Sequence, residues 1–254
     1  MPKIDTVILR SNNPEAQRNF YCTVLGMKHF SDNCVGYGGE QAKLNFPQAE
    51  GKYTPKPSDL YWKITLAVPN IELACQQLRE LGVDVGAPKQ FLDVGYLAHF
   101  TDPEGFTIEL IEHWFQGQRG DEHINPDLLG GGAHLNLLTL RANNIGNIIT
   151  LCESWGMKQL CIQPLESHGF TLYFFAFTSD SPPSLDLYAV ENREWLYQRK
   201  YTILEVQHLH KEVEIQQPHN AEAGYAGTLF SGFTENITKN ELFVTTLKEM
   251  QSGL

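Results

Sequence analysis

Two glutamates in strand-like segments are the side chains best suited to chemistry. Glu109 lies in FTIELIE, where the alternation of a β-strand puts its side chain on the same face as Ile111. Glu205 lies in TILEVQHL, between Leu204 and Val206, which should face the core. Two carboxylates held about 4–6 Å apart could share a divalent cation or a proton. We therefore expect their function to depend on how the two segments are placed.

A histidine and a lysine could work together with these acids. His99 lies just before the turn at residues 102–105 (DPEG), which leads into the Glu109 segment. Because an imidazole titrates near neutral pH, His99 could act as a general base or bind a ligand, although an outward-facing polar side chain fits the same alternating pattern. Lys63, in WKITLAVPN, would supply a fixed positive charge if it lay between two anions.

A repeated segment organises the chain. Residues 8–28 (ILRSNNPEAQRNFYCTVLGMK) recur at 139–158 as TLRANNIGNIITLCESWGMK. Each copy predicts a strand, an asparagine N-cap, a helix and a glycine stop, namely Asn13 and Gly26 in the first copy, and Asn144 and Gly156 in the second. In the first helix, spacing every four residues predicts a buried stripe of Ala16, Phe20 and Val24.

The pattern restarts twice more, which predicts four modules. WKITLAVPN is a strand ending in the cap Asn70, followed by a helix that stops at Gly82 and by the strands 94–101 and 106–112. A fourth, truncated module is expected from 227–233 and a helix whose capping box is Thr238 and Glu241. The sequence thus predicts an α+β fold of tandem βαβββ modules, with domains at 1–115 and 131–254 joined by a linker at 116–130.

Composition excludes several function classes. The formal net charge of −11 repels phosphate backbones and anionic membranes, so we expect no nucleic-acid or membrane partner. The N-terminus lacks the apolar run of a secretion signal, which favours a cytoplasmic protein. The 5 cysteines are odd in number and never spaced CxxC, and a buried reduced thiol is the expected state of each.

These modules resemble the vicinal oxygen chelate superfamily, which includes glyoxalase I, bleomycin-binding proteins and extradiol dioxygenases, and the similarity to glyoxalase I is the closest. The segments that carry the resemblance are TVILRSNNPEAQRNFYCTVLGMK, ITLAVPNIELACQQLRELGVDV, YLAHFTDPEGFTIELIE, GFTLYFFAFTSD and YTILEVQHL. The resemblance implies that pairs of modules form half-open barrels, each with a cup for a small molecule and a divalent cation such as Zn, Ni, Mn or Fe.

The resemblance also assigns candidate ligands. Glu109 and Glu205 match the family's carboxylate positions, whereas Asn45 stands where the first module would need a third carboxylate. The family's opening-strand positions, usually His or Gln, hold Thr6 in the first module, Lys63 in the second, and Asn136 or Leu137 in the third, depending on register. His134 lies nearby, and an exposed or simply hydrogen-bonded histidine is the expected interpretation.

The sequence allows two ways of pairing the modules. If each half closed its own cup, neither cup would hold a convincing site. If the third module paired with the second, Glu205, Glu109 and Lys63 would share one cup. There, a divalent cation could be bound by the two carboxylates and Asn136, or Lys63 could take the place of the cation.

The remaining candidates concern the substrate. Arg10 and Arg141 occupy matched positions where the family's arginine contacts a glutathione carboxylate, although a structural role fits them equally well, and Tyr96 could line the cup. The leading hypothesis is a metal-dependent lyase or isomerase that stabilises an enediolate or oxyanion, with Glu109 and His99 as catalytic residues. The alternative is a small-molecule binding or resistance protein that has lost the full ligand set. A homodimer is compatible with either.

Overall fold

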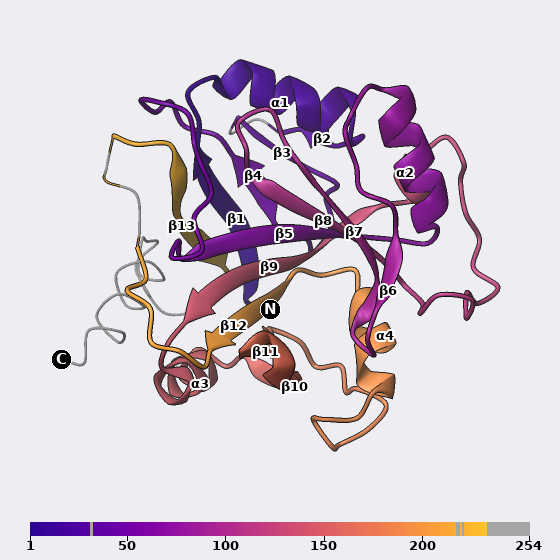
Figure 1. Ribbon diagram of the computed structural model, residues 1–254, viewed down its shortest axis with the longest axis vertical. Helices are drawn as coiled ribbons and strands as arrows, with labels where there is room; N and C mark the ends of the chain where they lie inside the picture. The colour runs from indigo at the N-terminus through magenta and orange to yellow at the C-terminus, as the bar shows by residue number, and fades with distance from the viewer. Residues whose placement is uncertain (31–32, 217–218, 220, 233–254) are drawn as a thin grey trace.

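Two β-sheets organise the computed structural model, which describes residues 1–30, 33–216, 219 and 221–232 (Figure 1). The larger sheet has eight strands, in the order β10 (Lys158–Leu165), β11 (Phe170–Ala176), β12 (Ile203–Leu209), β9 (His134–Ala142), β5 (Tyr61–Val68), β8 (Thr107–Glu112), β7 (Gly95–Thr101) and β6 (Lys89–Phe91). Its centre is the antiparallel pair β5–β9, which joins the second module to the third. The pairing across the two halves is therefore the one that forms.

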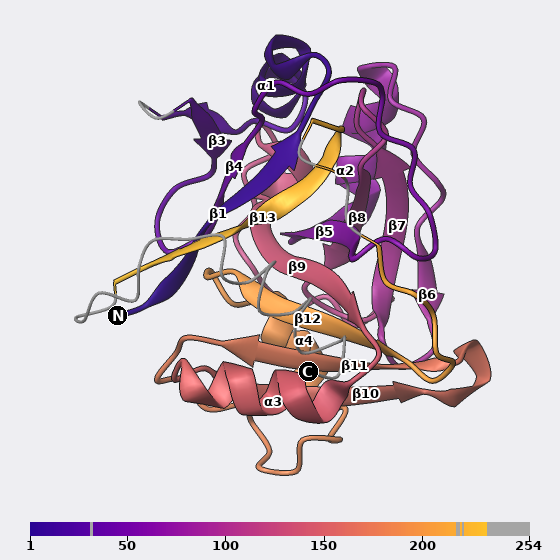
Figure 2. The same cartoon turned by 90° about the vertical axis from the view of Figure 1, so that its left-hand side faces the viewer.

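The smaller sheet also combines strands from distant parts of the chain. Its order is β13 (Gly224–Ser231), β1 (Lys3–Arg10), β4 (Lys43–Asn45), β3 (Cys34–Gly36) and β2 (Lys28–His29). Figure 2 shows β1 and β13 side by side, and they pair antiparallel over nearly their full length. Residues 227–231 of the predicted strand are thus part of β13, whereas residue 233 and the predicted helix with Thr238 and Glu241 lie outside the described residues.

The predicted caps and stops position three helices of the repeated units. These are α1 (Pro14–Thr23), α2 (Ile71–Glu80) and α3 (Ile145–Ser154). The side chains of Asn13, Asn70 and Asn144 each accept a backbone N–H three residues on, which confirms all three as N-caps. Gly26, Gly82 and Gly156 have φ of 73°, 79° and 80°, the left-handed conformation that ends a helix.

The residues buried on α1 lie one position later in the sequence than predicted. The prediction of its buried stripe was therefore wrong. Gln17 and Tyr21 are 1% and 0% exposed, whereas Ala16, Phe20 and Val24 are only partly buried. The cause is a polar contact, because Gln17 Nε2 and Tyr21 Oη donate to Asp102 Oδ2 over 2.7 and 2.9 Å. The DPEG turn thus docks against α1, and hydrogen bonding rather than apolar spacing sets the rotation of the helix.

Apolar side chains form two clusters on opposite faces of the eight-stranded sheet. The larger cluster joins this sheet to the five-stranded sheet and to α1, α2 and α3, and the smaller one includes Leu137, Phe174, Ile203 and Ile111. Residues two apart share a face of a strand, so the smaller cluster marks the face that also bears Glu109 and Glu205. We call it the inner face.

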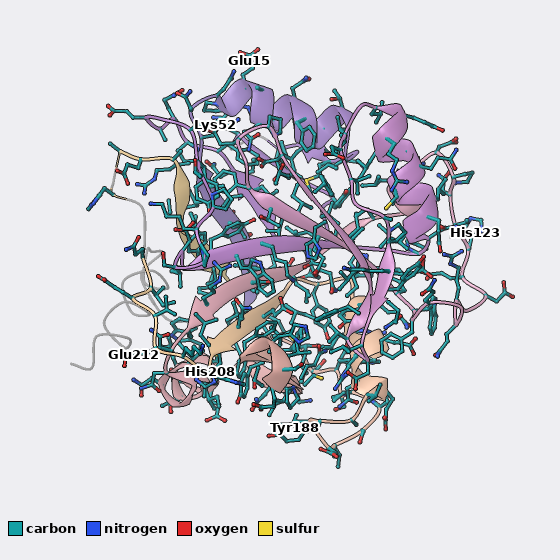
Figure 3. All side chains as sticks on the ribbon, in the orientation of Figure 1. Glu15, Lys52, His123, Tyr188, His208 and Glu212 are labelled. Atoms are coloured by element: carbon teal, nitrogen blue, oxygen red, sulfur yellow. The ribbon has the colours of Figure 1, made fainter. Side chains whose placement is uncertain are left out.

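The sheet curls around its inner face. The ring of Phe91, on edge strand β6, lies 5.0 Å from the ring of His168, in the 3₁₀ turn η2 (Glu166–His168) that follows the opposite edge strand, β10. Charged side chains such as Glu15, Lys52 and Glu212 extend outward from the periphery (Figure 3). None of the helices in the described residues is long and apolar enough to cross a membrane.

The α+β prediction, with tandem modules and curled sheets, is confirmed. The division into domains at 1–115 and 131–254 stays a prediction about the sequence repeat. Each sheet takes strands from both of these ranges, with the β5–β9 pair as the central contact in the larger sheet and β1–β13 in the smaller. We therefore expect neither range to fold without the other.

Cleavage of the linker is expected to leave the two pieces associated, because the β5–β9 and β1–β13 ladders hold them together. A protease site inserted between Pro126 and Asp127 would test this by size-exclusion chromatography of cut and uncut protein, which should elute together. Residues 1–115 produced alone should show no cooperative thermal transition, because β5 would lose its neighbour β9. A cooperatively melting 1–115 fragment would contradict the expectation.

Candidate functional site

The register of four adjacent strands gathers the candidate residues on the inner face. Lys63 of β5 lies opposite Thr139 of β9, and Glu205 of β12 pairs with Thr139 on its other side. On the far side of β5, Thr65 pairs with Glu109 of β8. The sheet order β12–β9–β5–β8 therefore places Glu205 and Glu109 on the two outer strands, with Lys63 between them.

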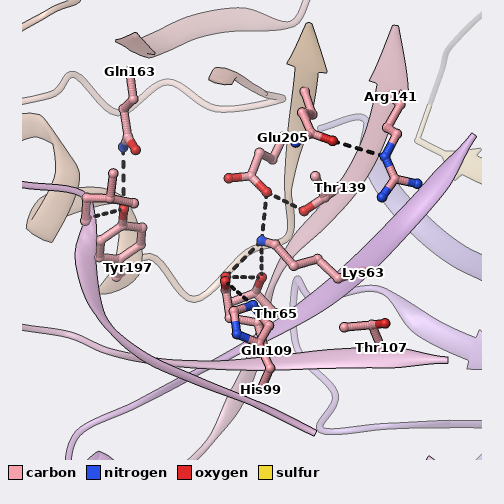
Figure 4. Close-up of polar contacts among 12 residues, drawn as sticks. Lys63, Thr65, His99, Thr107, Glu109, Thr139, Arg141, Gln163, Tyr197 and Glu205 are labelled. Carbon is pink, nitrogen blue, oxygen red and sulfur yellow. Dashed lines mark hydrogen bonds and ion pairs between the residues drawn. The ribbon is translucent and has the colours of Figure 1, made fainter. Parts of the chain in front are cut away.

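Lys63 joins the two carboxylates directly (Figure 4). Its Nζ lies 2.8 Å from Glu109 Oε1 and 2.9 Å from Glu205 Oε2, and its third hydrogen bond goes to Thr65 Oγ1 at 3.2 Å. An ammonium has three N–H donors, so all of those of Lys63 are used within the protein. Lys63 therefore holds the acids in place and has no donor left for a ligand.

Two threonines complete what we call the Lys63 cluster, which comprises Lys63, Thr65, Glu109, Thr139 and Glu205. Thr65 Oγ1 donates to Glu109 Oε1 over 3.0 Å, and Thr139 Oγ1 donates to Glu205 Oε2. Sequence analysis missed both threonines. Strand alternation could have found Thr65, two residues after Lys63, whereas Thr139 could be placed only once β9 was known to adjoin β5 and β12.

Burial makes the charges of the cluster interdependent. Lys63, Glu109 and Glu205 are 2%, 5% and 3% exposed. Burial opposes the ionisation of Glu109, but the Lys63 ammonium and the His99 ring outweigh it and lower the pKa of Glu109 to about 2. Burial likewise opposes the charge on Lys63, yet Glu109 and Glu205 outweigh it and raise the lysine pKa. Both partners therefore stay charged near neutral pH.

His99 extends the cluster toward solvent. Its Nε2 lies 2.9 Å from Glu109 Oε2, and 43% of its side chain is exposed. His99 of β7 pairs with Glu109 of β8, so both project from the inner face. The carboxylate fixes the ring through Nε2, which leaves Nδ1 as the nitrogen available for a proton or a ligand.

The predicted substrate-binding arginines lie apart from one another. Arg141, on β9, donates from Nε to Gln207 Oε1 over 3.0 Å and from Nη1 to the carbonyl oxygens of Lys56, Asp59 and Tyr61. These contacts tie β9 to the segment that precedes β5. Arg10 lies on β1 of the five-stranded sheet, where burial lowers its pKa and Glu222 opposes that shift.

Three other predicted residues lie away from the cluster. Asn136 is fully buried, and its Nδ2 donates to the carbonyl oxygens of Leu196 and Arg199, both over 3.1 Å. The Tyr96 hydroxyl faces Glu72 of α2, on the opposite face of the sheet. His134 is 2% exposed and packs its ring 5.2 Å from that of His113. The structure thus brings together Lys63, Glu109, Glu205 and His99 but not these three.

A short helix that sequence analysis missed closes one end of the inner face. In α4 (Glu191–Tyr197), Tyr197 is 1% exposed, donates its hydroxyl to Val94 O over 2.7 Å and accepts a hydrogen bond from Gln163 Nε2 at 3.3 Å. These contacts connect the loop before β7 with β10, near opposite edges of the sheet. A helix of 7 residues that lies outside the repeated units shows little hydrophobic periodicity in the sequence.

The donor set does not fit a divalent cation as it stands. The described residues contain no group of three or more His, Cys, Asp or Glu side chains arranged to hold a metal ion. Two such donors, Glu109 and Glu205, converge, but the Lys63 ammonium lies between them and hydrogen-bonds both. Asn136, the predicted third ligand, faces backbone carbonyls instead.

Comparisons with known proteins agree with this architecture. Residues 3–110 match the model of the Glyoxalase/Bleomycin resistance protein/Dioxygenase superfamily. Glyoxalase I from Zea mays superposes with a TM-score of 0.64 over 91% of this chain and 74% of that one, at 17% sequence identity. A "putative dioxygenase" from Bacillus subtilis subsp. subtilis str. 168 gives a TM-score of 0.56 at 13% identity, over 98% of this chain and 74% of that one. No curated protein sequence matches.

Replacing Lys63 is expected to destabilise the protein more than replacing the whole ionic set. Lys63→Met leaves two buried carboxylates without a counter-charge, which typically costs about 3–5 kcal/mol of unfolding free energy. Adding Glu109→Gln and Glu205→Gln removes those charges and should recover much of the loss. Urea unfolding monitored by circular dichroism would measure both.

Lys89→Met is the matched control, because Lys89 is exposed on β6 and its replacement should change stability by no more than about 0.5 kcal/mol. A Lys63→Met protein as stable as the unmodified chain would show that the carboxylates do not need the ammonium.

Proposed function

The chain belongs to the Glyoxalase/Bleomycin resistance protein/Dioxygenase superfamily, and we propose that it binds a small organic molecule on the inner face of the eight-stranded sheet without a divalent metal ion. One observation carries the proposal: Lys63 Nζ hydrogen-bonds both carboxylates, at 2.8 and 2.9 Å. Members of this superfamily commonly use a divalent metal, and here an ammonium lies between the two acids that would bind it.

The hydrogen bonds of the cluster favour binding over oxyanion stabilisation. The three N–H donors of Lys63 are already used by Glu109, Glu205 and Thr65. An enediolate or oxyanion needs donors or positive charge aimed at the developing anion. An ammonium whose three donors are all used inside the protein has none to offer such an intermediate, which favours a binding protein over the metal-dependent lyase of the leading hypothesis.

Metal analysis tests the proposal. Protein purified without chelator should contain no stoichiometric Zn, Ni, Mn or Fe, and neither these ions nor a chelator should shift its melting temperature, because a ligand stabilises the native state only if it binds that state. Lys63→His, which puts an imidazole between two carboxylates, should gain a metal-dependent rise in melting temperature.

Lys89→His is the control for that gain, since it adds an exposed imidazole on β6 opposite Leu97, without a carboxylate on each side of it. The proposal fails if the unmodified protein carries about one equivalent of metal that persists in Lys63→Met and is lost in Glu109→Gln.

A second candidate function is supported by the His99–Glu109 pair. A carboxylate 2.9 Å from Nε2 of a partly exposed imidazole orients the ring and leaves Nδ1 as the nitrogen that can accept a proton from a substrate, the arrangement of a general base. On this interpretation the protein is a lyase or isomerase that removes a proton from a small substrate without a metal ion.

Hydrogen–deuterium exchange at carbon would test the second candidate. If His99 removes protons next to a carbonyl, the protein should catalyse exchange in small ketones and aldehydes, followed by NMR in D₂O, and His99→Gln should slow it about 10²–10⁴-fold. His123→Gln, which changes a histidine of the exposed linker (Figure 3), should have no effect. Equal exchange rates in His99→Gln and the unmodified protein would eliminate this candidate.

A further inference from the structure

Two hydrogen-bond acceptors on the inner face have no partner among the described residues. Gln163 is 0% exposed, and its Oε1 is a buried atom that receives no hydrogen bond. Glu205 accepts both of its hydrogen bonds, from Lys63 and Thr139, on Oε2, which leaves Oε1 without a donor. Buried acceptors are nearly always satisfied in native proteins, so Gln163 Oε1 indicates a missing water, ion or ligand. Glu205 Oε1 is not fully buried and is a second acceptor that such a ligand can reach.

The two atoms come from the same face and point toward one region. Along β10, β11 and β12, Cys161 pairs with Phe174 and Phe174 with Glu205, and Gln163 lies two residues from Cys161. Gln163 and Glu205 therefore project from the same face. Figure 4 shows the amide oxygen of Gln163 on the side that faces Glu205, and the free oxygen of Glu205 directed back toward it.

The orientation of the Gln163 amide follows from its neighbour. The Tyr197 hydroxyl donates its only proton to Val94 O, so it can only accept a hydrogen bond from Gln163. A flipped amide would place an oxygen against the hydroxyl oxygen with no hydrogen between them. Nε2 must therefore face Tyr197, and Oε1 must be the free atom.

Among the four carboxylate oxygens of the Lys63 cluster, Glu205 Oε1 is the one that accepts no hydrogen bond from the described residues. Both oxygens of Glu109 are occupied, one by Lys63 and Thr65 and the other by His99. Of the nearby cations, Lys63 has used all three donors, and Arg141 is bound to Gln207 and to three carbonyl oxygens. The unpartnered oxygen of the Glu205 carboxylate, which carries part of its charge, therefore faces the same region as the free oxygen of Gln163.

Aromatic rings lie next to this charge. The register places Trp62 as an extra residue between the pairs Tyr61–Leu140 and Lys63–Thr139, a bulge that puts its ring 4.9 Å from Lys63 Nζ. Trp62 meets Phe170 edge to face at 5.9 Å, and both are only partly buried. The Arg141 guanidinium also lies 5.6 Å from the Trp62 ring, so the accessible parts of the two rings offer an apolar surface for the body of a ligand.

From these observations we propose that the inner face binds a small organic cation, whose ammonium group donates to Glu205 Oε1 and Gln163 Oε1 while its apolar part packs on Trp62 and Phe170. The assignment rests on the proposed binding function and names its ligand class. An ammonium supplies donors for both acceptors and a charge opposite to that of the Glu205 carboxylate, a neutral ligand lacks that attraction, and an anion would be repelled.

Three probes of similar shape and different charge would test the ligand class, namely 2-phenylethylamine, 2-phenylethanol and 3-phenylpropionate. Isothermal titration calorimetry at neutral pH should show the amine binding at least tenfold more tightly than the alcohol, with the carboxylate weakest. In Glu205→Gln the preference of amine over alcohol should fall to about one. In Gln163→Met the affinity for the amine should fall while that for the alcohol stays constant.

Glu15→Gln is the matched control, since it removes one negative charge on exposed helix α1 and should leave the preference unchanged. Because the amine-to-alcohol ratio is measured within each variant, a loss of stability in Glu205→Gln does not obscure it. Equal affinities in the unmodified protein, tighter binding of the carboxylate, or no binding of the amine would overturn the ligand class. Stoichiometric metal in the purified protein would instead overturn the proposed function.

Discussion

The ammonium of Lys63 is the contact on which the rest of the inner face depends. It hydrogen-bonds one carboxylate from the strand β8 and one from β12, and the three residues are at most 5% exposed. Two anions buried this close would repel each other strongly without a cation between them. The positions of β12, β9, β5 and β8 relative to one another are therefore coupled to a single side chain as well as to their backbone ladders.

The way the modules pair explains why this chemistry is confined to one sheet. The eight-stranded sheet joins the second and third modules, which carry Glu109 and Glu205. The equivalent positions in the five-stranded sheet include Thr6, which donates to Asp5, and Asn45, which donates to Cys34. Neither supplies a buried charge. The smaller sheet therefore contributes to the core, whereas the larger one carries the candidate site.

Much of the fold could be predicted from local signals. Asparagine caps and left-handed glycines act through their own neighbours, so α1, α2 and α3 and the strands around them follow from the sequence. The rotation of α1 could not, because it depends on Asp102, more than 80 residues away in the chain. The position of the Asn136 side chain also could not be predicted from the sequence. A bulge opposite Thr65 and Leu66 makes it an extra residue on β9, and its amide binds the end of α4.

Mutual dependence within the Lys63 cluster also limits how its sequence can change. A substitution of Lys63 alone leaves two buried carboxylates without a counter-charge. A substitution of either glutamate alone removes one of the two ion pairs of the buried ammonium. Substitutions at such positions are strongly non-additive. An evolutionary path that exchanges this ionic set for another must therefore pass through less stable intermediates, so the three residues are expected to change together or not at all.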